Sequence, residues 1–166
     1  MTWTYRAPWW LPGGDAQTIY AAKFAQRYEG ATPHWARERW FTPDADFVDV
    51  DWLLSPHATE NSPLLVLFHG LEGSSQSHYV EAFAEVAAAR GWRMAVPHFR
   101  GCSGEINWRP RAYHSGDYEE IGWMLQRFHQ LHQGPTFAVG ISLGGNALMR
   151  WAGEMGHTAT QVVNGI

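Results

Sequence analysis

The stretch Thr136-Phe-Ala-Val-Gly-Ile-Ser-Leu-Gly-Gly145 joins an apolar run to a glycine-rich turn that surrounds one serine. Its first six residues form a short apolar run, typical of a strand that is buried on both faces. The residues from Asn146 to Trp151 have the pattern of the start of a helix. The sequence therefore predicts a strand, a sharp turn and a helix, with Ser142 on the turn.

Ser142 lies between Gly140 and Gly144 in the pattern G-x-S-x-G. Small residues are needed on both sides, because larger side chains would collide with the neighbouring strand or helix at so sharp a turn. The turn also places the hydroxyl at a helix N-terminus, where free N–H groups stabilise developing negative charge. The pattern predicts that Ser142 is a catalytic nucleophile.

Two other interpretations of this turn are open. Serine often caps helices, so a purely structural role for Ser142 also fits. Glycine-rich turns also bind phosphates, but neither G-x-x-x-x-G-K-[ST] nor G-x-G-x-x-G is present, and no basic residue follows closely. The order of strand, turn and helix favours the nucleophile over both.

The rest of the chain alternates apolar runs with segments of helical spacing. The expected elements are a hairpin of Arg37–Phe41 and Asp46–Leu54, a strand at Pro63–Phe68, a helix at His78–Arg90, a strand at Arg93–Pro97 and a helix at Tyr118–Leu131. Strands that alternate with helices form a parallel sheet with right-handed crossovers. We predict an α/β fold, a mostly parallel sheet with helices on both faces and an N-terminal hairpin, in one domain over residues 1–166.

The segment His69-Gly-Leu-Glu-Gly73 directly follows the first buried strand of this sheet. Acyl-transfer enzymes with a nucleophile on such a turn place an oxyanion donor at this point of the chain. We expect the donors to be the backbone N–H groups of Leu71 and of Leu143, the residue after the nucleophile. His69 itself is expected to be structural and to bond nearby backbone.

Two further segments carry reactive side chains. Cys102 and Ser103 lie in a glycine-rich turn after the strand Arg93–Pro97, where a lone cysteine is usually an inert filler. Tyr113-His-Ser-Gly-Asp117 contains a histidine and an acid, but capping of the following helix by Ser115 or Asp117 explains the segment adequately. No catalytic role is assigned to either segment.

His129 and His132 are three residues apart on a predicted helix. That spacing suits a metal, but no third ligand is evident, so a solvated helix face is the preferred interpretation. We predict no metal centre and no cofactor.

Composition excludes several classes of protein. The formal net charge is -4 and the nine histidines are scattered, so there is no basic stripe for nucleic acid. A single cysteine forms no internal disulfide and the first residues do not resemble a secretory signal, so we expect a cytoplasmic protein. The longest apolar stretch, Leu64 to Phe68, is far shorter than the roughly 20 residues that span a bilayer.

Ten tryptophans are a high number for 166 residues, and Trp3, Trp9 and Trp10 crowd the first segment. Such side chains are most often buried, so we expect them to pack onto the surface of the core. The alternative is an aromatic wall for an apolar substrate or an entrance that faces a membrane.

Five separated blocks, in this order, resemble the YheT-like hydrolases of the α/β-hydrolase superfamily. The blocks are Pro8–Gly14 with Gln17–Ile19, Leu67–Ser75 with Ser77–Tyr79, Phe99–Glu105, Tyr113–Asp117 and Gly140–Asn146. The resemblance extends from Pro8 to about Gly153 and is far more specific than G-x-S-x-G alone. One departure is Asp15, which stands where the family commonly has a histidine.

The resemblance implies an eight-stranded, mostly parallel sheet and a Ser-Asp-His triad that acts on carboxylic esters, as serine esterases and acylglycerol lipases do. Onto this sequence it carries Ser142 as nucleophile, with Leu71 and Leu143 as oxyanion donors. The expected partner is a small-molecule or lipid ester. Two alternatives are an acyltransferase, in which an alcohol replaces water, and a non-catalytic binding module of the same fold.

Family members are longer, and their triad acid and histidine follow the nucleophile in the second half of the chain. The residues Gln161–Ile166 have the pattern of a strand that has just begun. We therefore expect a C-terminally truncated hydrolase domain. These residues alone should have little or no esterase activity and, with an apolar sheet edge exposed, poor solubility.

Overall fold

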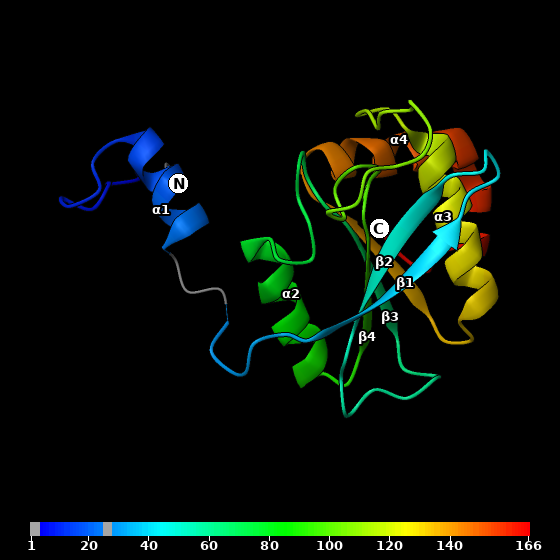
Figure 1. Cartoon of the computed structure of the whole chain (residues 1–166). Coiled ribbons are helices and arrows are strands. Elements are labelled where there is room, and N and C mark those ends of the chain that lie inside the picture. The colour runs from blue at the N-terminus through cyan, green and yellow to red at the C-terminus, as the bar shows by residue number, and fades with distance from the viewer. Residues whose placement is uncertain (1–3, 25–27) are drawn as a thin grey trace.

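The computed structural model describes residues 4–24 and 28–166. At its centre is a five-stranded sheet with the strand order β1-β2-β4-β3-β5 (Figure 1). The elements in chain order are α1 Gly14–Lys23, β1 Trp35–Phe41, β2 Phe47–Leu53, β3 Leu64–Phe68, α2 His78–Ala89, β4 Arg93–Pro97, α3 Tyr118–Leu131, β5 Thr136–Gly140, α4 Leu143–Met155 and the 3-10 helix η1 Gly156–Gln161.

The sheet combines a parallel part with an antiparallel hairpin. Strand β3 pairs in parallel with β4 on one side and with β5 on the other. Strand β2 runs antiparallel to β1 and to β4. All five residues of β3 are buried, as expected of a central parallel strand. The predicted α/β fold, its hairpin and its three parallel strands are confirmed.

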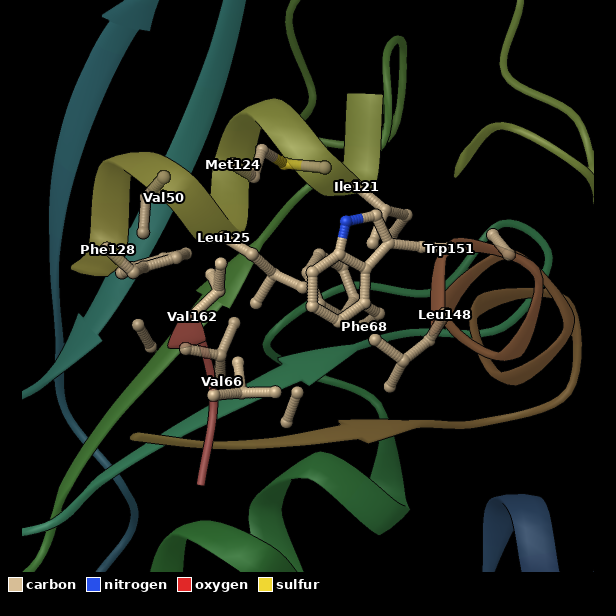
Figure 2. Close-up of a cluster of buried hydrophobic side chains, with 14 of the residues drawn as sticks. Val50, Val66, Phe68, Ile121, Met124, Leu125, Phe128, Leu148, Trp151 and Val162 are labelled. Atoms are coloured by element: carbon tan, nitrogen blue, oxygen red, sulfur yellow. The ribbon is translucent and has the colours of Figure 1, made fainter. Parts of the chain in front are cut away.

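Helices cover both faces of this sheet, because successive side chains of a strand point to opposite faces. Leu65 and Leu67 of β3 belong to the cluster that packs beneath α2. Val66 and Phe68 belong to the opposite cluster, which α3 and α4 cover. Figure 2 shows Leu125 of α3 pointing into this second cluster.

Helix α4 begins at Leu143, earlier than the expected start at Asn146. Glycine is unfavourable inside a helix, so Gly144 and Gly145 suggested a turn in the sequence. In the structure they belong to the first turn of α4, and they are glycines because neighbouring backbone lies too close for a side chain there.

The segment before the sheet contains helix α1, which the sequence did not predict. Ile19 of this helix and Phe24, which directly follows it, are exposed, so the described apolar side chains of α1 pack on no core. Trp9 is 90% exposed and Trp10 is 52% exposed, so the expectation that they pack onto the core is wrong; Trp3 lies outside the described residues. Figure 1 shows α1 standing apart from the sheet. Among the described residues, no helix is long and apolar enough to cross a membrane.

The last residues run alongside the outer edge of β5. The N–H of Asn164 donates to the Thr136 carbonyl at 2.7 Å, and the N–H of Ala138 donates to the Gly165 carbonyl at 3.0 Å. Phe137 and Gly165 form a parallel bridge. The predicted start of a strand at 161–166 is therefore present as one bridge, preceded by η1.

A substitution in the α3 interface tests this packing. Leu125 is fully buried, whereas Leu131 of the same helix is 53% exposed. We expect Leu125→Ala to lower the free energy of unfolding by about 2–5 kcal/mol, because it leaves a cavity between α3 and the sheet. Leu131→Ala should change it by less than about 0.5 kcal/mol. Urea unfolding followed by circular dichroism measures both, and equal losses would contradict the packing described.

Candidate active site

Ser142 lies on the turn between β5 and α4, in a backbone conformation that residues other than glycine rarely adopt. Its φ is 54° and its ψ is -114°. The residue is exposed to solvent and occupies the N-cap position of α4, yet its side chain makes no capping hydrogen bond. Strain of this kind often accompanies functional sites. A simple capping role does not account for a hydroxyl that makes no capping bond.

The glycines on either side of Ser142 are required by close contacts. A Cβ atom on Gly140 would lie 2.5 Å from the Gly145 Cα. A Cβ atom on Gly144 would lie 2.5 Å from the His69 carbonyl oxygen and would also strike the Phe68 carbonyl. The first turn of α4 therefore packs directly against the end of β3, and this contact fixes the position of Ser142.

The loop after β3, residues 69–73, lies beside Ser142. The N–H of Ile141 donates to the Phe68 carbonyl at 3.0 Å, which ties the two strand ends together. A Cβ atom on Gly70 would lie only 3.4 Å from the Ser142 Cβ. The two segments singled out in the sequence thus meet at one edge of the sheet, as parallel pairing of β3 and β5 requires.

Most backbone N–H groups of the 69–73 loop have a protein acceptor. Gly70 donates to the Tyr79 hydroxyl at 2.9 Å, Glu72 donates to the Tyr113 hydroxyl at 3.0 Å, and Gly73 donates to the Gly70 carbonyl at 3.0 Å. The N–H of Leu71 has no acceptor among the described residues.

Leu143 offers the second free amide. It is the first residue of α4, so its N–H has no acceptor within the helix, and no other acceptor occurs in the described part of the chain. Leu71 and Leu143 therefore present unpaired donors from the two segments that flank Ser142. These are the two amides that the sequence analysis named as oxyanion donors, and that role stays a prediction.

His69 is held with both ring nitrogens occupied. Its Nε2 accepts the N–H of Phe99 at 3.1 Å, so the proton is on Nδ1, which donates to the Gly70 carbonyl at 2.7 Å. Burial, with a smaller contribution from nearby His98, lowers the pKa of His69 to about 4. His69 is therefore a neutral structural residue and does not serve Ser142 as a base.

Ser142 has no base among its described neighbours. Its hydroxyl makes no hydrogen bond to a histidine or carboxylate in residues 4–24 and 28–166. The described residues thus contain a candidate nucleophile and candidate oxyanion donors without the groups that move its proton.

A buried Ser-Asp-His cluster lies elsewhere in the fold and was missed in the sequence. Asp51 accepts the Ser75 hydroxyl at 2.6 Å, the His98 Nε2 at 2.8 Å and the Arg37 guanidinium at 2.7 Å. Ser75 and His98 both bond to the Asp51 carboxylate and not to each other. In a catalytic triad the serine bonds to the histidine, so this cluster is not arranged for nucleophilic catalysis. The sequence feature that could have revealed this cluster is the pair of acids at alternate positions of β2, Asp49 and Asp51, which are both buried.

The other side chains considered in the sequence lie outside this site or bond elsewhere. Cys102 is half-buried, and burial raises the pKa of its thiol, so it stays protonated. Asp117 stands at the N-cap of α3 without capping it and binds Arg111 at 2.6 Å. His129 is exposed, but His132 is buried with its Nδ1 facing Arg93 at 3.3 Å, so the expected solvated face is wrong for His132.

Comparison with known proteins shows the family to which the chain belongs. The family described as the alpha/beta hydrolase fold matches residues 63–163, which is more than half of the chain. The chain belongs to this family.

Two relatives show which members of this family the chain is similar to. The chain is 49% identical over 118 residues to the Escherichia coli protein named "Putative esterase YheT", covering 70% of the chain and 34% of that protein. It is 26% identical over 162 residues to human phospholipase ABHD3, covering 94% of the chain and 39% of that protein. The resemblance to YheT-like hydrolases is confirmed, and the chain spans little more than a third of the length of either relative.

Solved structures agree on the fold. The chain matches brefeldin A esterase, a bacterial homologue of human hormone-sensitive lipase, with a TM-score of 0.58 at 17% identity, covering 89% of the chain and 43% of that structure. Est1E from Butyrivibrio proteoclasticus matches with the same TM-score at 15% identity, covering 80% and 48%.

Two glycines of α4 provide a matched test of the close contact beneath Ser142. Gly144→Ala should lower the free energy of unfolding by about 1–3 kcal/mol or more, because its Cβ meets the backbone of β3. Gly153 has nothing within 4 Å of its Cβ position. Gly153→Ala should raise the free energy of unfolding by up to about 1 kcal/mol, through helix propensity alone. Thermal unfolding measures both, and a stable Gly144→Ala protein would contradict the contact.

The neutral state of His69 predicts a pH dependence of stability. The unfolded chain protonates this ring near its ordinary pKa of 6.5, whereas the folded protein protonates it near 4. The unfolded state therefore binds the proton first, and the free energy of unfolding should fall by up to about 3 kcal/mol as the pH drops from 6.5 to 4.

Burial also lowers the pKa of His132, so this ring adds to the pH dependence of stability in the same direction. The difference in slope between the original protein and His69→Gln isolates the contribution of His69. Urea unfolding at a series of pH values measures the two slopes, and parallel slopes would show that His69 is not held neutral.

Proposed function

We propose that the protein containing these 166 residues cleaves carboxylic esters, with the Ser142 hydroxyl as nucleophile. The observation that carries the proposal is an exposed hydroxyl on a strained turn beside the free amides of Leu71 and Leu143. Donors in this arrangement stabilise the oxyanion of acyl transfer. The names of the relatives, an esterase and a phospholipase, support the same reaction class and a small-molecule or lipid ester as substrate.

In this mechanism the Ser142 Oγ attacks the ester carbonyl carbon, and the carbonyl oxygen takes up negative charge. The N–H groups of Leu71 and Leu143 donate to that oxygen, and the loss of one such donor typically costs about 3–4 kcal/mol in barrier. Collapse of the tetrahedral intermediate expels the alcohol and leaves an acyl-enzyme, which water then hydrolyses. The proton of Ser142 passes to a general base during the attack.

That base has to be a group other than His69, whose ring nitrogens are both engaged. In the proposed enzyme, the base and the acid that orients it are groups that do not contact Ser142 in the described structure. Without them, ester hydrolysis slows by orders of magnitude. The 166 residues by themselves should therefore show little esterase activity.

The lack of a base beside Ser142 in the described residues also favours a second candidate function. A non-catalytic binding module would keep the free amides of Leu71 and Leu143 and bind an ester or carboxylate there without turnover. Covalent reaction at Ser142 separates the two functions, because only the enzyme activates that hydroxyl.

A fluorophosphonate probe tests the proposal in the natural protein that contains these residues. We expect labelling of the original protein and of Ser115→Ala, and loss of labelling in Ser142→Ala, since Ser115 is exposed and lies outside the site. Gel fluorescence and peptide mass mapping give the readout. Folded protein that resists the probe would support the binding module, and labelling that persists in Ser142→Ala would place the nucleophile elsewhere.

A further inference from the structure

Leu71 does not hold its own peptide in place. Its side chain is 69% exposed, and its N–H has no acceptor in the described part of the chain. The direction of that N–H therefore depends on the residues on either side, Gly70 and Glu72. Each of these has its amide bound by the hydroxyl of a tyrosine from a distant segment.

Tyr113 holds the residue after Leu71. Its hydroxyl accepts the N–H of Glu72 at 3.0 Å and donates to the Glu72 Oε1 at 2.8 Å. A single oxygen therefore binds both the backbone amide and the side-chain carboxylate of Glu72. Glu72 has a φ of 52°, a conformation that a non-glycine residue keeps only where its surroundings over-determine it. The Tyr113 ring is itself fixed by stacking on buried Phe99, with centroids 5.2 Å apart and an interplanar angle of 11°.

Tyr79 holds the residue before Leu71. Its hydroxyl accepts the N–H of Gly70 at 2.9 Å. A Cβ atom on Gly73 would lie 2.7 Å from the same hydroxyl, so the oxygen of Tyr79 fits inside the loop against both glycines. Tyr79 reaches this point from the first turn of α2, which is packed on the sheet.

The remaining contact fixes the orientation of the Leu71 peptide. The Gly70 carbonyl accepts from the His69 Nδ1 at 2.7 Å and from the Gly73 N–H at 3.0 Å. In a trans peptide the carbonyl of one residue and the N–H of the next point in opposite directions. Holding the Gly70 carbonyl on one side therefore aims the Leu71 N–H to the other side.

We propose that Tyr79 and Tyr113 are positioning residues, whose hydroxyls bind the amides of Gly70 and Glu72 so that, between these two residues, Leu71 offers its N–H to the oxyanion beside that of Leu143. This inference rests on the ester hydrolase function proposed above. It predicts an effect on the transition state rather than on substrate binding, because the Leu71 N–H acts on charge that develops during the reaction. Neither tyrosine touches the substrate in this scheme.

The test compares Tyr79→Phe and Tyr113→Phe in the natural protein that contains these residues. With a chromogenic ester, each variant should lower kcat about tenfold and change KM less than about twofold, because a donor displaced by a fraction of an ångström loses part of its effect. Tyr118→Phe is the matched control, since the Tyr118 ring packs against Arg150 and its hydroxyl has no hydrogen-bond partner among the described residues. It should leave both constants within about twofold of the original.

Amide hydrogen exchange of the same natural protein gives a readout that does not depend on activity. Tyr113→Phe should speed exchange at Glu72, and Tyr79→Phe should speed it at Gly70, each at least about tenfold, whereas Tyr118→Phe should change neither.

Ser142→Ala keeps the two proposals distinguishable. If Ser142→Ala abolishes turnover while both tyrosine variants match Tyr118→Phe in kcat, the positioning proposal is wrong and the hydrolase stands. If Ser142→Ala keeps full turnover, the hydrolase proposal fails and this inference falls with it. A rise in KM with unchanged kcat in the tyrosine variants would also overturn the positioning role.

Discussion

The parallel pairing of β3 with β5 is the constraint on which the site depends. Its register places Phe68 opposite Gly140, so both strands end at the same level and their loops emerge side by side. The Phe68 carbonyl accepts the N–H of Ile141 and lies too close to Gly144 to admit a side chain. The position of Ser142 relative to Gly70 is therefore set by contacts between backbone atoms.

Ion pairs around the buried Arg100 hold the other loops of the same edge. Arg100, after β4, is bound by Asp44 and Asp46 of the hairpin and by Glu120 of α3, all within 2.9 Å. Such ion pairs contribute little net stability, because desolvation offsets their attraction, but removing one partner leaves an unpaired buried charge. They therefore hold the loop after β4, the hairpin and α3 in fixed positions relative to one another. One of those segments contains Phe99, whose N–H holds His69 and whose ring supports Tyr113.

The parts of this molecule that were predictable from the sequence are those with a local signal. The apolar runs at 64–68, 93–97 and 136–140 are strands, because burial on both faces leaves a continuous apolar pattern. The meeting of the Ser142 and Leu71 loops followed from the parallel order of those strands. Helix α1 was missed because its apolar residues face no core, and α4 was started late because Gly144 looks like a helix breaker until its contact with β3 is known.

The support of the 69–73 loop had no such signal, because it joins residues 9 and 41 positions apart through single hydroxyl groups. The proposed oxyanion donors are themselves uncharged, and the one carboxylate of the 69–73 loop, that of Glu72, accepts a hydrogen bond from the Tyr113 hydroxyl. His69 is kept uncharged by burial, and the donors are backbone amides and the N-terminus of α4. A protonated His69 has a hydrogen on both ring nitrogens, so it would lose the bond from the Phe99 N–H that fixes the ring and, through Nδ1, the Gly70 carbonyl.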